Sequence, residues 1–76
     1  METAYVMINC EMGSESSVIE KIKPVQCVKE IRGVFGNYDL LIKLQGTTID
    51  EISETITTKI RGIEKIRCTT TLICYR

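Results

Sequence analysis

The sequence lacks histidine altogether, and its 76 residues include one proline and one phenylalanine. Without histidine, the chain has neither the commonest general base nor the commonest metal ligand. The four cysteines never form the C-x-x-C spacing that zinc sites and soft-metal chaperones need. Glycine-rich phosphate loops and nucleophile elbows are absent as well. We therefore expect no metal, no other cofactor and no enzymatic activity.

Net charge is missing too, because ten basic residues balance ten acidic ones. A neutral chain has no basic field, so direct binding to nucleic acid is not expected. No apolar run approaches about 18 residues, which argues against a membrane span. The N-terminus, Met1–Ala4, lacks the positive region of a secretory signal. These absences predict a cytoplasmic protein.

The cysteines are expected to be small apolar core residues, because a reducing cytosol keeps thiols free. They are Cys10, Cys27, Cys68 and Cys74. A disulfide such as Cys10 to Cys68 is the alternative if the organism is a hyperthermophile.

The length allows one small domain, spanning residues 1–76. A chain of this size buries roughly 60% of the surface that its unfolded form exposes, so a lone monomer is only marginally stable. We therefore expect stabilisation by oligomerisation.

The first half of the chain predicts a strand, a helix and a hairpin. The strand covers Tyr5–Cys10, and the helix covers Ser14–Lys23 with a capping box formed by Ser17 and Glu20. Pro24 stops this helix.

The hairpin begins with a half-exposed edge strand over Cys27–Phe35. Gly36 and Asn37 predict a tight turn, since both tolerate positive φ. The returning strand covers Tyr38–Gln45.

The second half contains the most strongly patterned helix, Thr47–Arg61. One apolar stripe runs along it, made by Ile49, Ile52, Ile56 and Ile60. Thr48 and Glu51 predict a second capping box, and Gly62 a left-handed C-terminal cap. The last strand covers Ile66–Tyr75.

This order, βαββαβ, predicts an α+β, ferredoxin-like sandwich with two helices on one face of a four-stranded antiparallel sheet. Three strands contain consecutive apolar residues, Val6–Ile8, Leu40–Ile42 and Leu72–Cys74. Because strand side chains alternate between faces, these strands present apolar groups on both sides. The face without helices needs a cover, and we expect a second copy of the chain, giving a homodimer.

The stretch Gly33–Leu40 has two interpretations. In one it is a plain hairpin, in which Asn37 serves the turn, Tyr38 packs and Asp39 caps local amides. In the other, backbone N–H groups of the turn hold a ligand carboxylate while Asp39 pairs with an ammonium group, which suits an α-amino acid. Both interpretations stay open on the residues alone.

Two segments, Ile31–Leu44 and Arg61–Leu72, resemble the effector-binding domain of the Lrp/AsnC family of prokaryotic transcription factors, known as RAM. The resemblance covers about residues 4–75. Its most specific parts are Gly36–Leu40, Gly62–Ile63 and Thr69–Thr71.

The resemblance implies a domain that dimerises by sheet packing and assembles further, into a tetramer or octamer. It also implies a small effector, typically an amino acid, bound near the boundary between dimers. The positions that match the family's ligand-contacting regions are Gly36, Asn37, Tyr38, Asp39, Thr69, Thr70 and Thr71. For the threonines, ordinary β-propensity is the alternative explanation.

Full-length members of this family carry a helix-turn-helix domain, whereas this chain begins close to its first strand. The resemblance therefore predicts a stand-alone form that modulates transcription or amino-acid metabolism indirectly. It would act through mixed assembly with a full-length Lrp/AsnC-type regulator or through competition for the effector.

Other proteins with this architecture give competing predictions. An ACT-like subunit that binds an amino acid and controls a partner enzyme would use the stretch Met12–Ser14. Small dimeric monooxygenase-like proteins share the fold, but the lack of histidine disfavours them. Acylphosphatase-like hydrolysis is disfavoured because no arginine-bearing anion loop follows the first strand.

Overall fold

The computed structural model describes residues 1–75 and confirms the ferredoxin-like fold. Arg76, the last residue of the predicted domain, lies outside the described residues. The strands are β1 (Glu2–Cys10), β2 (Val28–Gly33), β3 (Leu40–Gly46) and β4 (Ile66–Cys74). The helices are α1 (Glu15–Ile22) and α2 (Ile49–Thr55), which continues as the π-helix η1 (Ile56–Ile60).

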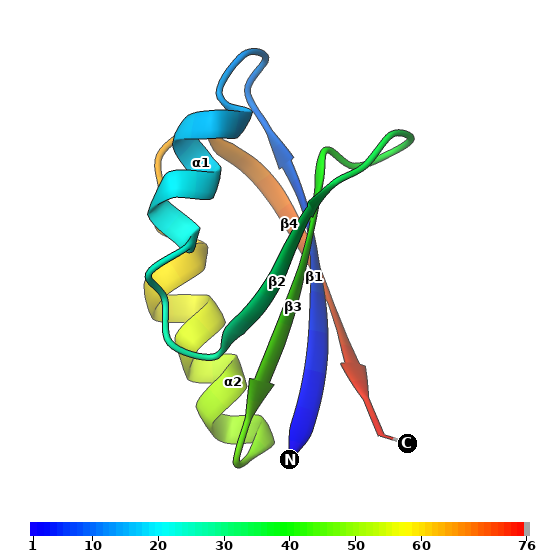
Figure 1. Ribbon diagram of the computed structural model, residues 1–76, viewed down its shortest axis with the longest axis vertical. Coiled ribbons are helices and arrows are strands. Elements are labelled where there is room, and N and C mark those ends of the chain that lie inside the picture. Colours follow the sequence, from blue (N-terminus) through cyan, green and yellow to red (C-terminus); the bar gives the residue numbers. More distant parts are fainter. Residues whose placement is uncertain (76) are drawn as a thin grey trace.

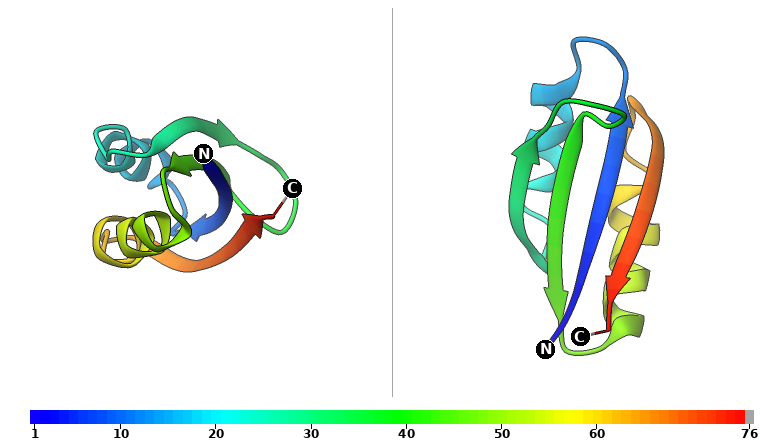
Figure 2. Two further views of the ribbon diagram at one scale, coloured as in Figure 1. Left: turned by 90° about the horizontal axis from the view of Figure 1, so that it is seen from below. Right: turned by 90° about the vertical axis from the view of Figure 1, so that its right-hand side faces the viewer.

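The sheet is antiparallel, with the strand order β2-β3-β1-β4. The predicted edge position of β2 is confirmed. Both helices lie on one face of the sheet, and the other face is open (Figures 1 and 2). Within residues 1–75, the helices are too short and too polar to traverse a bilayer.

The core lies between the helices and the two central strands. Alternate residues of β1 and β3 point into it, because strand side chains alternate between faces. Each of the following core residues is at most 4% exposed: Ala4, Val6, Ile8, Val18, Ile22, Leu40, Ile42, Leu44, Ile52, Ile56 and Ile60.

Helix α1 begins at Glu15, whereas a capping box formed by Ser17 and Glu20 would place its N-cap at Ser17. Its N-cap is Ser14, whose hydroxyl donates to the Glu11 carbonyl at 2.5 Å rather than capping the helix. Ser17 therefore lies inside the helix, and the predicted Ser17–Glu20 box is wrong. The stop before Pro24 is confirmed, because α1 ends at Ile22.

At the start of α2, the hydroxyl of Thr48 accepts a hydrogen bond from the Glu51 amide at 3.1 Å, as predicted. The Glu51 carboxylate accepts from the amide of Thr47, one residue before the N-cap, at 2.8 Å. The first bond satisfies an amide that the first helical turn leaves without a helical acceptor, and the second ties the residue before the N-cap to the same turn.

The single predicted helix Thr47–Arg61 is an α-helix followed by a π-helical turn, in which the Arg61 amide donates to Ile56 at 2.9 Å. The isoleucine spacing explains the change. Ile52, Ile56 and Ile60 are four apart, slightly more than the about 3.6 residues of an α-helical turn. The wider π-helical turn compensates for this drift and keeps all three side chains buried against the sheet.

The left-handed residue after the second helix is Lys65 (φ 77°), so the predicted left-handed cap at Gly62 is wrong. Lys65 takes this conformation where its carbonyl accepts the Glu11 amide at 2.8 Å. The left-handed conformation therefore lies at a contact between two loops and not at the end of the helix.

We expect Lys65→Gly to raise the free energy of unfolding by about 0.5–1 kcal/mol. The left-handed conformation costs a non-glycine residue about 1–2 kcal/mol, and glycine removes this cost. The greater backbone entropy of glycine in the unfolded chain offsets about 0.5–1 kcal/mol of that stabilisation. Glu64→Gly, at the neighbouring position with negative φ, is the control and should destabilise. Urea denaturation measures both, and equal destabilisation by the two variants would contradict the account.

The open face carries apolar groups, as predicted. Met7 and Leu41 alternate with buried neighbours and so point away from the helices. Leu72 lies on the same face, because it pairs with Tyr5, which lies between the buried Ala4 and Val6. The cysteine prediction holds only in part. All four thiols are free, but Cys10 alone belongs to the buried core, while Cys68 is exposed.

Candidate functional site

The connection between β2 and β3 is a six-residue loop, residues 34–39, and not the predicted tight turn. The Val34 amide donates to the Asp39 carbonyl at 2.9 Å and closes the loop. Gly36 has φ 124°, whereas Asn37 is not left-handed. The loop leans out over the open face of the sheet (Figure 2).

Asp39 fastens this loop to the end of β1. Its amide donates to the Ile8 carbonyl at 2.9 Å, and its carboxylate oxygen Oδ2 accepts from the Cys10 amide at 2.9 Å. Asp39 thus caps an amide, but the amide belongs to a distant strand and not to the local turn that the plain-hairpin interpretation expected. Backbone pairing between β1 and β3 ends at Ile8 and Leu40. The bond from the Cys10 amide to the Asp39 carboxylate continues the contact between the two strands beyond that point.

Tyr38 fastens the same loop at a second point. Its hydroxyl shares a hydrogen bond with the Thr70 hydroxyl of β4 at 3.1 Å. Because β1 lies between β3 and β4, the Tyr38 side chain reaches across it. The loop is therefore held against both β1 and β4.

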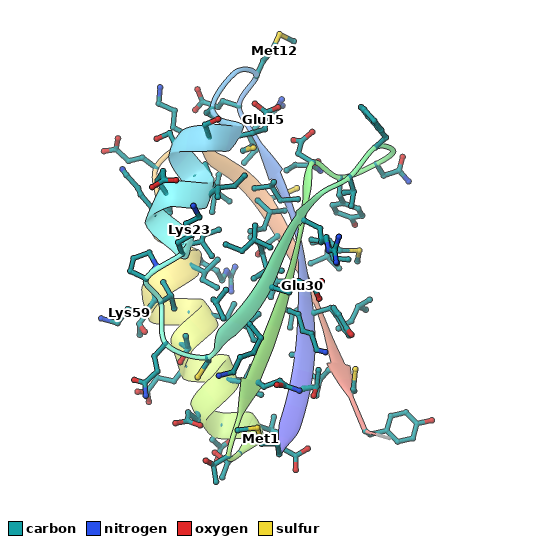
Figure 3. The ribbon with its side chains drawn as sticks, viewed as in Figure 1. Met1, Met12, Glu15, Lys23, Glu30 and Lys59 are labelled. Carbon is teal, nitrogen blue, oxygen red and sulfur yellow. The ribbon has the colours of Figure 1, made fainter. Side chains whose placement is uncertain are left out.

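A hollow of about 680 Å³ lies beside Asp39, at the end of the sheet where β1 finishes and β4 begins. Two carboxylates and one guanidinium border it. Its lining residues are Asn9, Cys10, Met12, Glu15, Asp39, Arg67 and Cys68. Figure 3 shows Met12 and Glu15 at this end of the molecule.

Two local features bring these walls together. The pairing of β1 with β4 shifts register between Asn9 and Cys10. The Glu11 amide donates to Lys65, which joins the loop after β1 to the loop before β4. This joint places the first residues of α1 and of β4 beside Asp39.

The residues predicted to bind a ligand are spread over several surfaces. Asp39 lines the hollow, whereas Gly36 and Asn37 lie exposed at the loop tip. Tyr38 and Thr70 meet on the open face. The remaining two, Thr69 and Thr71, line a separate groove beside α2 and η1.

Sequence reasoning missed Asn9, Glu15 and Arg67 as residues of this hollow. A signal existed for one wall, because the ACT-like alternative pointed to Met12–Ser14, and Met12 lines the hollow. Arg67 lies inside the segment that resembles the Lrp/AsnC domain, but nothing in the sequence indicates which residues its guanidinium faces.

Burial raises the pKa of the Cys10 thiol above its ordinary value of 9.0. The nearby carboxylates of Asp39 and Glu15 also raise it, while a hydrogen bond with Ser14 opposes the shift. The thiol is consequently neutral at physiological pH. Its contribution to stability is full below the unfolded pKa and is lost as the pH rises through the folded pKa.

We expect the difference in unfolding free energy between the natural chain and Cys10→Ala to shrink as the pH rises above about 9, since only the natural chain has this thiol to ionise. Cys68→Ala, at an exposed cysteine, is the control. Denaturation curves at several pH values measure the difference, and a constant difference for Cys10→Ala would refute the assigned environment.

A family model, described as the Lrp/AsnC ligand binding domain, matches residues 3–76 of this chain. An uncharacterized HTH-type transcriptional regulator of Pyrococcus furiosus is 28% identical over 76 residues, which cover 96% of this chain and 51% of the relative. The chain thus spans about half the length of this curated relative.

Two solved structures show the same fold. A hypothetical protein from Pyrococcus horikoshii is 36% identical, with a TM-score of 0.91 over 100% of this chain and 92% of that one. A transcriptional regulator from Neisseria meningitidis, solved as a complex with L-Met, is 9% identical, with a TM-score of 0.87 over 99% of this chain and 50% of that one.

Proposed function

Since the chain belongs to the Lrp/AsnC ligand-binding domain family, we propose that it is an oligomeric sensor of a free amino acid. The observation that carries the proposal is the hollow, which offers charges of both signs. Among the described residues, neither Glu15 nor Arg67 forms an ion pair. A free amino acid carries both an ammonium and a carboxylate group and can satisfy such charges together.

Each end of the ligand has a partner of suitable chemistry. The Arg67 guanidinium can hold the α-carboxylate through two parallel hydrogen bonds. Asp39 uses Oδ2 for the Cys10 amide, which leaves its other oxygen for the α-ammonium group. The L-Met bound to the Neisseria meningitidis regulator supports a ligand of this class.

The exposed loop tip extends the proposed site to a second subunit. Gly36 and Asn37 do not line the hollow of their own chain, but their exposure leaves them free to face a neighbouring copy. The other predicted residues, Tyr38, Thr69, Thr70 and Thr71, are half-buried except for the exposed Thr71, and they stay in the proposed site as residues at subunit boundaries. The ligand would thus bind near the contact between dimers of a tetramer or octamer.

A test of the site is titration calorimetry with the common amino acids at up to millimolar concentration. We expect one or a few to bind, and Asp39→Asn to weaken that binding at least tenfold. The asparagine oxygen can still accept the Cys10 amide, so the variant removes the charge and keeps the fold. Asp50→Asn, on α2 away from the hollow, is the control.

Unchanged affinity in Asp39→Asn would remove this residue from the site. If no common amino acid binds the natural chain at millimolar concentration, the sensing function itself is refuted.

The proposal includes a homodimer joined through the open face. Leu72 is 53% exposed there, and Met7 and Leu41 extend the apolar surface across β1 and β3. Packing two such faces removes this surface from water at about 25 cal/mol per Å². That gain supplies the stability that a 76-residue chain lacks alone.

Sedimentation velocity at micromolar concentration should find a dimer or a larger assembly. Leu72→Glu, which adds a charge to the open face, should shift the distribution toward monomer with little effect on the fold. Ser16→Glu, in the first turn of α1, should leave the assembly unchanged. A monodisperse monomer in the natural chain would contradict the dimer.

The relatives are transcriptional regulators and not enzymes, so the effect of sensing falls on transcription or on amino-acid metabolism. The chain has no net charge with which to bind DNA. We therefore place its action in the cytoplasm, on a full-length Lrp/AsnC-type regulator, through mixed assembly or competition for the effector. Co-sedimentation of the chain with a purified helix-turn-helix relative tests this route.

A further inference from the structure

We propose that the hollow binds an α-amino acid with a positively charged side chain, of the lysine or ornithine type. This inference rests on the proposed amino-acid sensing and names the class of the ligand. It comes from the charges around the hollow and from the elements that carry them.

The charges do not balance without a ligand. Asp39 and Glu15 contribute two negative charges to the hollow and Arg67 one positive charge. A neutral amino acid has an ammonium and a carboxylate group and would leave one negative charge uncompensated. A basic amino acid brings one additional positive charge and makes the site neutral, because its side-chain cation can pair with the carboxylate that is left over.

The positions of the three charges assign their partners. Asp39 and Arg67 belong to the ends of β3 and β4 at the sheet, where they face the two α-groups of the ligand. Glu15 is the first residue of α1 and borders the hollow from the helix layer. It is therefore the charge that remains for the cation at the far end of a side chain.

The rest of the lining suits the methylene stem of such a side chain. Cys10 is buried and its thiol is neutral. Met12 borders the hollow on the loop after β1, and its side chain is 99% exposed and points outward (Figure 3), so it is free to change its conformation. Methionine is flexible and adapts to irregular apolar shapes. A volume of about 680 Å³ is ample for an amino acid of this length.

Glu15 also has a plain structural role, because a carboxylate in the first turn of a helix interacts favourably with the helix dipole. That role predicts a small loss of stability in Glu15→Gln and no effect on ligand choice. The two explanations therefore differ in what the variant does to discrimination between ligands.

The decisive experiment compares L-lysine with L-norleucine, which has the same carbon chain but no side-chain ammonium group. Titration calorimetry should show lysine binding about tenfold more tightly, as one charge-assisted hydrogen bond provides. Glu15→Gln should abolish most of this preference and leave norleucine unchanged. Glu20→Gln, at an exposed position of the same helix paired with Lys23, is the matched control.

Equal binding of lysine and norleucine by the natural chain would overturn the inference and leave amino-acid sensing intact. A lysine preference that survives in Glu15→Gln would overturn the role of Glu15. Asp39→Asn should weaken both ligands by the same factor, because it contacts the shared α-ammonium group. Failure of every amino acid to bind would refute the proposed function and this inference with it.

Discussion

The double attachment of Asp39 to β1 is the interaction on which the site depends. Pairing between β1 and β3 stops at Ile8 and Leu40, so the Cys10 amide has no backbone acceptor on that side. A buried amide without a partner costs about 1–3 kcal/mol. The Asp39 carboxylate removes this cost, and by doing so it holds loop 34–39 against the sheet and forms one wall of the hollow.

Most of the fold could be predicted because local patterns and global packing agree. The isoleucines of the second helix, the alternation in the strands and the stop at Pro24 each correspond to an observed element. The misses lie where tertiary contacts override local signals. Lys65 is left-handed at a joint with the loop after β1, which is not written in its neighbouring residues. The start of α1 is a local exception, because the Ser14 hydroxyl bonds to the carbonyl of Glu11, three residues earlier.

The site could be predicted only in part, since its residues come from separate elements. Successive strand residues point to opposite faces, so the run Thr69–Thr71 divides between the open face and the α2 groove. Glu15 and Arg67 meet Asp39 only because the first crossover connection leaves from the end of β1 and the second returns to that same end. No spacing in the chain encodes that meeting, whereas Asp39 was identifiable from its loop motif.

Tyr38 and Asp39 are covalent neighbours that hold opposite surfaces of the molecule. The hydroxyl of Tyr38 is bonded on the open face, and the carboxylate of Asp39 borders the hollow. One peptide unit joins them, so a movement of the loop backbone at this point displaces both side chains. Where occupancy of the hollow changes the packing on the open face, linkage requires that packing there change the affinity of the hollow by the same factor.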